Sequence, residues 1–333
     1  MRPGTGEFSR RARRPVAAFT RIDALLLLMA IIWGTNYSIV KSAFRELDPQ
    51  AFNACRMVLA SSIFLAVIAS FRRRPALARL SRTRSDAWAT VLHTPAALTR
   101  RDWLELVVLG LVGHCCYQYC FIGGLALTSV ANSSLMLAAT PVVIALASAA
   151  LGLDRVSGLH WIGAALSMAG IYYVVGRGLA VGSDTIAGDL LMIAAVCCWA
   201  AYTLGSRRLM ERHSPVGVTG LSMAIGTALY VPLVWPHLRG VQWTAVSGRT
   251  WAAVIFSALL ALVVAYTIWY AAVREIGGAR TAVYSNVIPI VAMLTAVEFL
   301  GEPLGPRKLI GAATVIGGVA LTRVGRSRPV IPE

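Results

Sequence analysis

Long apolar stretches separated by short polar segments make up most of this chain. A helix that crosses a hydrocarbon core about 30 Å thick needs about 20 mostly apolar residues. Windows of that kind predict ten helical spans, at residues 23–42, 51–70, 103–122, 127–150, 157–176, 188–206, 215–236, 251–271, 280–299 and 305–322. Between Glu105 and Asp154 the chain contains no Asp, Glu, Lys or Arg. The pattern therefore predicts an all-α integral membrane protein.

The second half of this pattern repeats the first. A shift of 148 residues aligns three pairs without a gap: Pro141 with Pro289, Asp154 with Glu302, and Gly170 with Gly318. Internal repeats in an apolar chain are typical of transporters built from duplicated helical bundles. The expected segments are a basic cytoplasmic N-terminus at 1–22, a first five-helix repeat at 23–176 with a basic insert at 71–102, a linker at 177–187, a second five-helix repeat at 188–322, and a cytoplasmic tail at 323–333.

Five helices per repeat is an odd number, so the second repeat must enter the membrane upside down relative to the first. The seven-residue spacing of Gly163 and Gly170 recurs at Gly311 and Gly318. Small residues on one helix face let neighbouring backbones approach closely. We interpret these glycines as packing sites, between the two halves or between protomers, and the oligomeric state stays open.

Composition agrees with a membrane protein, and charge gives the orientation. Hydrophobic residues make up 57% of the chain and charged residues 14%, whereas a soluble domain carries roughly a quarter charged residues. The net charge is +16, and the arginines gather at the ends of apolar segments rather than in a nucleic-acid-binding module. By the positive-inside rule, we expect a multi-pass protein of the cell inner (plasma) membrane with both termini cytoplasmic. The 71–102 insert is expected to contact anionic lipid headgroups, and no nucleic acid is expected as a partner.

Several short motifs resemble those of a known family. They are Trp33-Gly34-Thr35-Asn36-Tyr37, Arg56-Met57-Val58-Leu59-Ala60, and Gly301-Glu302-Pro303 followed by Gly311 to Gly318. In order and spacing they resemble the EamA family of the drug/metabolite transporter superfamily. The resemblance implies two inverted five-helix halves that move small solutes by alternating access. The chain departs from the family pattern at Trp199-Ala200-Ala201-Tyr202, which lacks the Gly and Asn of the first span.

Polar side chains near the middle of apolar spans are candidate substrate contacts, because a buried polar group in lipid costs free energy unless it has a partner. The His114 imidazole lies mid-span with two polar residues one turn further on. Hydrogen bonding between helices is the structural alternative. The candidate substrate-binding residues are Asn36, Tyr37, His114, Tyr117, Gln118, Thr140, Trp199, Tyr202, Tyr284, Ser285 and Asn286, with Pro141 and Pro289 as candidate hinges because proline frees a backbone carbonyl one turn earlier.

Three ionisable residues are candidates for ion coupling or anion contact: His114, Arg56 and Glu298. Arg56 could instead extend its guanidinium to the outer interface. His114, Cys116 and Cys120 could suggest a metal site, but cysteine is an ordinary small apolar residue in such spans. No metal and no cofactor are expected, and the cysteines, which all lie in apolar spans, predict no disulfide.

The sequence favours a secondary transporter, an exporter of small polar metabolites such as amino acids. The alternative is a proton-coupled exporter of lipophilic cations, which in the related small multidrug exporters depends on an acid in the first span. Residues 24–40 contain no acid, so Glu298 would have to replace it. No nucleophile elbow, zinc-binding helix motif or phosphate loop is present, so the sequence gives no indication of an enzyme.

Overall fold

The computed structural model describes residues 20–73, 91–92, 96–150, 154–155, 158–175, 183–276, 281, 284–324 and 328–329. Residues 1–19 of the expected cytoplasmic N-terminus, most of the 71–102 insert and most of the 323–333 tail lie outside this part of the chain. The expected lipid contact of the insert therefore stays a prediction.

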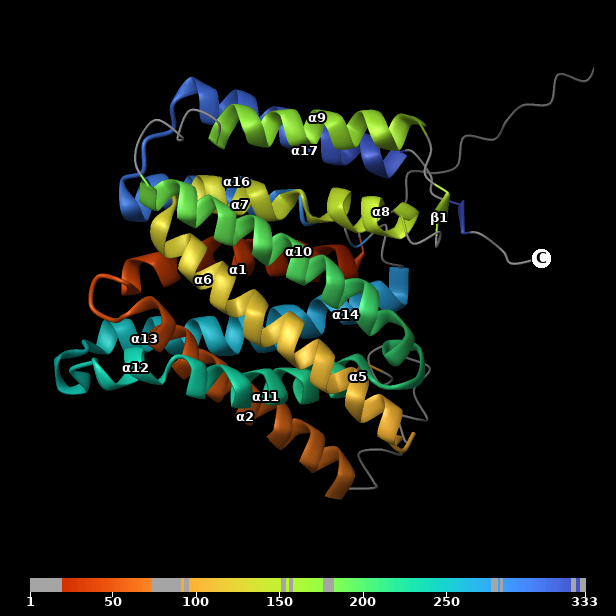
Figure 1. Cartoon of the computed structure of the whole chain (residues 1–333), viewed down its shortest axis with the longest axis vertical. Coiled ribbons are helices and arrows are strands. Elements are labelled where there is room, and N and C mark those ends of the chain that lie inside the picture. The colour runs from red at the N-terminus through yellow and green to blue at the C-terminus, as the bar shows by residue number, and fades with distance from the viewer. Residues whose placement is uncertain are drawn as a thin grey trace, which may run out of the picture.

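The described residues form helices joined by short turns (Figure 1). The elements are α1 (Arg21–Ala43), α2 (Pro49–Arg73), α5 (Arg100–Gly110), the π-helical turn η1 (Leu111–Cys116), α6 (Tyr117–Leu127), α7 (Val130–Ala138), α8 (Thr140–Ala150), β1 (Asp154–Arg155), α9 (Gly158–Val175), α10 (Ser183–Arg212), α11 (Pro215–Leu233), α12 (Trp235–Arg239), the 3₁₀ turn η3 (Trp243–Ala245), α13 (Gly248–Phe256), the π-helical turn η4 (Ser257–Val264), α14 (Ala265–Ile276), α16 (Val287–Leu300), α17 (Pro306–Val324) and β2 (Arg328–Pro329). The strands β1 and β2 form a two-residue antiparallel pair, which the apolar pattern did not predict.

Six helices are long and apolar enough to cross a membrane: Arg21–Ala43, Pro49–Phe71, Arg100–Leu127, Ile186–Arg212, Pro215–Leu233 and Gly248–Val273. Shorter apolar helices run over Val130–Ile144, Trp161–Gly170 and Val287–Leu300. The all-helical membrane architecture therefore agrees with the predicted fold class, while ten crossings remain a prediction.

Local chemistry explains where several helices begin, break and end. Thr20 caps α1 and Thr99 caps α5, each in a reciprocal capping box with an Asp three residues later. The predicted fourth span is interrupted at Ala139, and the predicted ninth span becomes α16 only from Val287. Each helix therefore restarts just before a proline, which is tolerated in the first turn because no intrahelical N–H bond is lost there.

Four helix pairs make the main packing contacts of the bundle: α9 with α17, α1 with α16, α6 with α10, and α2 with α11. In Figure 1 the α9/α17 pair forms the upper edge of the molecule. We call the side that carries α12, η3 and the α1–α2 turn the α12 end. The opposite side, with the start of α5 and the end of α10, is the α5 end.

The α9/α17 contact is reciprocal under the 148-residue shift. A Cβ on Gly170 would lie 2.8 Å from Val315 N, and a Cβ on Gly318 would lie 2.5 Å from Ser167 N. Gly170 also faces the Gly311 carbonyl, just as Gly318 faces that of Gly163. Two related surfaces that contact each other in this way have two-fold character. The repeated glycines thus bring the two helix backbones together, and the helices run antiparallel.

The α2/α11 contact is reciprocal too, with a shift of 166 residues. Ser61 Oγ lies 2.8 Å from Thr227 Oγ1, and these two residues are 166 apart. Gly220 packs on Phe64, while their counterparts at this shift, Ala54 and Tyr230, share a buried cluster. The π-helical turns also correspond, because adding 148 to the residue numbers of η1 places it within η4. Residues 148 or 166 apart are called repeat counterparts below.

Candidate functional site

The centre of the candidate site is the buried guanidinium of Arg56. By helix rise it lies about 10 Å along α2 from Pro49, and it is only 1% exposed, so it does not extend to the interface. Its Nε donates to Asn53 Oδ1 (2.7 Å), Nη1 to Ser257 Oγ (2.9 Å) and Nη2 to Gln118 Oε1 (2.7 Å). We call these four residues the guanidinium cluster. They come from α2, α6 and η4, and therefore from both halves of the chain.

A row of buried polar side chains follows one face of α2 towards this cluster. Gln50, Asn53 and Arg56 are spaced by three residues and all are buried. Tyr230 Oη donates to Gln50 Oε1, and the Gln50 amide donates to the Tyr119 carbonyl at 3.3 Å. Burying polar side chains within a membrane costs free energy, so a row of them marks a candidate path for a polar solute.

Repeat counterparts of the guanidinium cluster form a second polar group with different chemistry. Arg56 corresponds to Ser222 and Asn53 to Thr219, both at a shift of 166 residues. Ser222, Thr219 and Tyr270 lie near the Tyr202 hydroxyl, and neither that hydroxyl nor Thr219 Oγ1 has a hydrogen-bond partner among the described residues. Tyr202 is itself the counterpart of Asn36. We call Tyr202, Thr219, Ser222 and Tyr270 the hydroxyl cluster; it is neutral and buried.

His114 borders the hydroxyl cluster. Its ring packs edge-on against Tyr202, with centroids 5.0 Å apart, and its Cβ lies close to Gly226. The side chain is fully buried in the π-helical turn η1, and neither ring nitrogen has a hydrogen-bond partner among the described residues. Unsatisfied buried polar groups are rare in native proteins, and π-helical turns often mark functional positions.

A series of contacting aromatic rings adjoins the hydroxyl cluster, where Trp199 stacks on Tyr202. The rings contact one another in the order Trp33, Tyr266, Trp199, Tyr117, Phe121 and Tyr37, with neighbouring ring centroids 5.1 to 5.7 Å apart. The Trp33 indole also donates to the Ala261 carbonyl at 2.8 Å. Aromatic faces can accept the apolar part or the cationic group of a solute.

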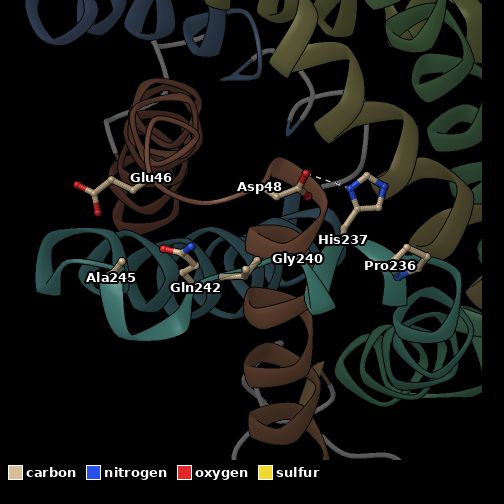
Figure 2. A pocket seen from close by; sticks show the side chains of 8 residues that line it. Glu46, Asp48, Pro236, His237, Gly240, Gln242 and Ala245 are labelled. Atoms are coloured by element: carbon tan, nitrogen blue, oxygen red, sulfur yellow. Dashed lines mark hydrogen bonds and ion pairs between the residues drawn. The ribbon is translucent and has the colours of Figure 1, made fainter.

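Two pockets open at the α12 end, one on each side of the start of α2. One, of about 430 Å³, is lined by residues that include Glu46 and Asp48. Figure 2 shows Glu46 on one side of it and the Asp48–His237 ion pair, 3.0 Å long, on the other. The second, of about 390 Å³, is lined by residues that include Lys41 and Glu302.

Polar contacts hold the helices together at both ends of the bundle. At the α5 end, Asp102 is buried and pairs with Arg212 (2.8 Å), the last residue of α10, and with His213 (3.2 Å), the residue after it. At the α12 end, Thr250 Oγ1 (2.8 Å) and Ser247 N (3.1 Å) donate to Glu46. These hydrogen bonds from Ser247 and Thr250 lower the pKa of Glu46.

The two end contacts occupy repeat-counterpart positions. Asp102 corresponds to Thr250 at a shift of 148 residues, and Glu46 to Arg212 at a shift of 166. The helix caps Thr99 and Ser247 also correspond. Corresponding positions of the two repeats therefore join helices at the two ends of the bundle. The contact is an ion pair at the α5 end and a hydrogen-bonded carboxylate at the α12 end.

The structure brings some of the predicted site residues together and leaves others apart. Gln118 contacts Arg56, and Tyr117, Trp199, Tyr202 and His114 are in ring contact. Asn36 is buried, and its Oδ1 has no hydrogen-bond partner among the described residues.

The remaining predicted residues lie elsewhere. The Thr140 hydroxyl bonds to the Leu137 carbonyl (2.6 Å), and Tyr284 donates to Asp23 (2.5 Å). Ser285 and Asn286 form the turn before α16, and Glu298 is exposed. Pro141 and Pro289 lie in the first turns of α8 and α16.

Sequence reasoning missed the cluster members Asn53, Ser257, Thr219 and Ser222, and the Gln50–Tyr230 pair beside them. Asn53 could have been found, because it precedes Arg56 by three residues and therefore shares its helix face. Ser257 and the Gln50–Tyr230 pair join segments about 200 residues apart, and nothing in the local pattern indicates their contacts.

Comparison with known proteins gives the family. The sequence model of the EamA-like transporter family matches residues 20–176 and 186–324. The uncharacterized transporter YyaM of Bacillus subtilis is 25% identical over 301 residues, 90% of this chain and 92% of the relative. An uncharacterized transporter of Archaeoglobus fulgidus is 28% identical over 308 residues, 91% of this chain and 97% of the relative.

Two further matches are a relative named as an exporter and a solved structure. A probable terminal-alkyne amino-acid exporter of Streptantibioticus cattleyicolor is 26% identical over 231 residues, 68% of this chain and 76% of the relative. A crystal structure with 20% identity matches with a TM-score of 0.60, over 91% of this chain and 98% of its own, which indicates a shared fold. The chain belongs to the EamA-like transporter family and is a multi-pass membrane transporter.

Proposed function

We propose that this member of the EamA-like transporter family exports small polar metabolites, amino acids among them, by alternating access between two inverted five-helix repeats. The observation that carries the proposal is a buried guanidinium cluster built from both halves of the chain, together with a second buried polar cluster that a series of aromatic rings adjoins. Solute pathways of secondary transporters lie near the bilayer midplane between such repeats.

Reciprocal contacts support the inverted repeat. Gly170 and Gly318 pack on each other's helices in antiparallel order, and Ser61 bonds to its own counterpart Thr227. The family model also matches the chain twice. On this proposal there are ten spans, both termini are cytoplasmic, and the protein lies in the plasma membrane with its α12 end outside.

The two end contacts support alternating access. Opening to the cytoplasm would separate Asp102 from Arg212 and His213, and opening to the outside would separate Glu46 from Thr250. A transporter must open one end at a time, so equivalent contacts at both ends are what the mechanism requires. Pro141 and Pro289, at the breaks before α8 and α16, would serve as hinges.

Substrate contacts are assigned to the predicted residues that meet in the buried core. They are Asn36, Tyr37, His114, Tyr117, Gln118, Trp199 and Tyr202. Amide, phenol and imidazole groups suit a polar solute without a strong net charge, and the amino-acid exporter among the relatives agrees with this assignment.

A proton-coupled exporter of lipophilic cations receives less support. Arg56 places a positive charge in the core, and like charges repel strongly where water is excluded. Glu298, the acid which that mechanism would need, is exposed on α16.

Counterflow in proteoliposomes tests the proposed function. Purified protein is reconstituted with a pooled mixture of amino acids and other small metabolites inside, and uptake of labelled solutes is read by mass spectrometry. We expect selective exchange that is weakened by Asn36→Ala and His114→Ala. If folded protein exchanges no solute above empty liposomes, the proposal fails.

A further inference from the structure

Arg56 holds a positive charge that no described carboxylate balances. The buried acids in the described part of the chain are Asp102 and Asp189. Asp102 pairs with Arg212 and His213, and Asp189 accepts a hydrogen bond from Thr128. No ion pair formed by the described residues includes Arg56.

Hydrogen bonds alone do not remove this charge. Burying an ion costs several kcal/mol even after the protein relaxes, and a nearby opposite charge is the usual compensation. Asn53, Gln118 and Ser257 accept from three of the N–H groups, but all three are neutral. A guanidinium has five N–H donors, so two remain, one on each terminal nitrogen.

We propose that Arg56 binds the carboxylate of the transported solute. This assignment rests on the proposed function and names its substrate class: solutes with a free carboxylate, whether zwitterionic amino acids or simple carboxylic acids. A carboxylate matches the two remaining N–H groups in bidentate geometry and supplies the missing negative charge.

The surroundings of Arg56 fit such a ligand. The row of Gln50 and Asn53 leads to it from the α12 end, where two pockets open. The rings of Tyr117 and Tyr266, which both contact Trp199, offer apolar and π surface to the rest of the solute. The hydroxyl cluster and His114 add neutral hydrogen-bond acceptors, which suit an ammonium group.

The three hydrogen-bond acceptors also fix the orientation of the planar Arg56 guanidinium. Asn53 holds Nε, while Gln118 and Ser257 hold the two terminal nitrogens, one each. A lysine would keep the charge but lose the planar fork. Charge and geometry can therefore be separated by substitution at this one position.

The test measures ligand-induced thermal stabilisation of the purified protein. The probes are matched triplets based on alanine, leucine and phenylalanine: the amino acid, its carboxamide, and the deaminated carboxylic acid. We expect stabilisation by the carboxylate-bearing members of at least one triplet and none by the amides. Apparent affinity should fall at least tenfold in Arg56→Gln and less in Arg56→Lys. Arg207→Gln, which removes an exposed positive charge from α10, should leave it unchanged.

Each outcome decides the assignment. A response to the amino acid alone, or to the deaminated acid as well, supports it and distinguishes zwitterions from general carboxylates. Amides as effective as acids, an unchanged response in Arg56→Gln, or no response to any triplet would overturn it. If counterflow of pooled metabolites proceeds while amides exchange as well as acids, the proposed function stands and the carboxylate assignment alone fails.

Discussion

The α9/α17 interface and the buried core treat the internal repeat in opposite ways. At the interface the two halves place glycine at the same positions, and Gly170 and Gly318 make matching backbone contacts. In the core the counterparts differ, since the buried Arg56 of the guanidinium cluster corresponds to the buried Ser222 of the hydroxyl cluster. The comparison indicates that contacts which hold the halves together keep the symmetry, while the candidate site departs from it.

The largest stability effect is expected at the symmetric interface. A Cβ on Gly318 would lie 2.5 Å from Ser167 N and 2.6 Å from the Gly163 carbonyl, so the two backbones would have to separate. We expect Gly318→Ala to cost about 3 kcal/mol of unfolding free energy, measured by denaturant or thermal unfolding in detergent. The adjacent Gly317 has open space at its Cβ position, and Gly317→Ala is the matched control. Equal stability of the two variants would contradict the packing role.

A second prediction exchanges residues between the asymmetric π-helical turns. His114 has two unpaired nitrogens, whereas its repeat counterpart Leu262 is a buried apolar residue. His114→Leu should leave the thermal midpoint unchanged or raise it while lowering solute exchange. Leu262→His should cost about 1–3 kcal/mol, because it buries an imidazole without a designed partner. If His114→Leu unfolds the protein, the histidine is a structural group rather than a substrate contact.

The Ser61–Thr227 hydrogen bond allows a double-mutant cycle on the repeat contact itself. Each single change, Ser61→Ala or Thr227→Val, leaves a buried hydroxyl unpaired and should cost about 1 kcal/mol. The double variant should cost less than the sum of the two. Additive losses would show that the two hydroxyl groups do not interact.

The smallest effect is expected at the α12 end. Hydrogen bonds from Ser247 and Thr250 lower the pKa of Glu46, so the folded state favours the carboxylate. The resulting stability is present above the ordinary carboxyl pKa of about 4.3 and is lost as pH falls through the lowered value. The melting curves of wild type and Glu46→Gln should therefore differ at neutral pH and converge in acid. A difference that does not change with pH would contradict this.

The helical membrane fold class could be predicted from the sequence, because long apolar runs are a strong signal. The breaks at Ala139 and before Val287 follow from Pro141 and Pro289, although their positions needed the structure. The π-helical turns and the β1–β2 pair could not be predicted, since they depend on contacts between distant segments.

The candidate site was predictable only in part. His114, Tyr117 and Gln118 stand out as polar residues in an apolar helix. For Arg56 the sequence allowed either an interfacial or a buried guanidinium, and contacts 62 and 201 residues away decide between them. Thr219 and Ser222 look like ordinary small residues of an apolar span until their position beside Tyr202 is known.

Carboxylate binding by Arg56 is best examined by counterflow of wild type and Arg56→Gln, measured side by side with thermal melting. We expect wild type to exchange carboxylate-bearing solutes, while exchange by Arg56→Gln falls to the level of empty liposomes. The variant should stay folded with a melting midpoint near that of wild type, because the loss of a buried charge offsets the loss of its three hydrogen bonds. A folded Arg56→Gln protein that exchanges the same solutes at the wild-type rate would contradict the account.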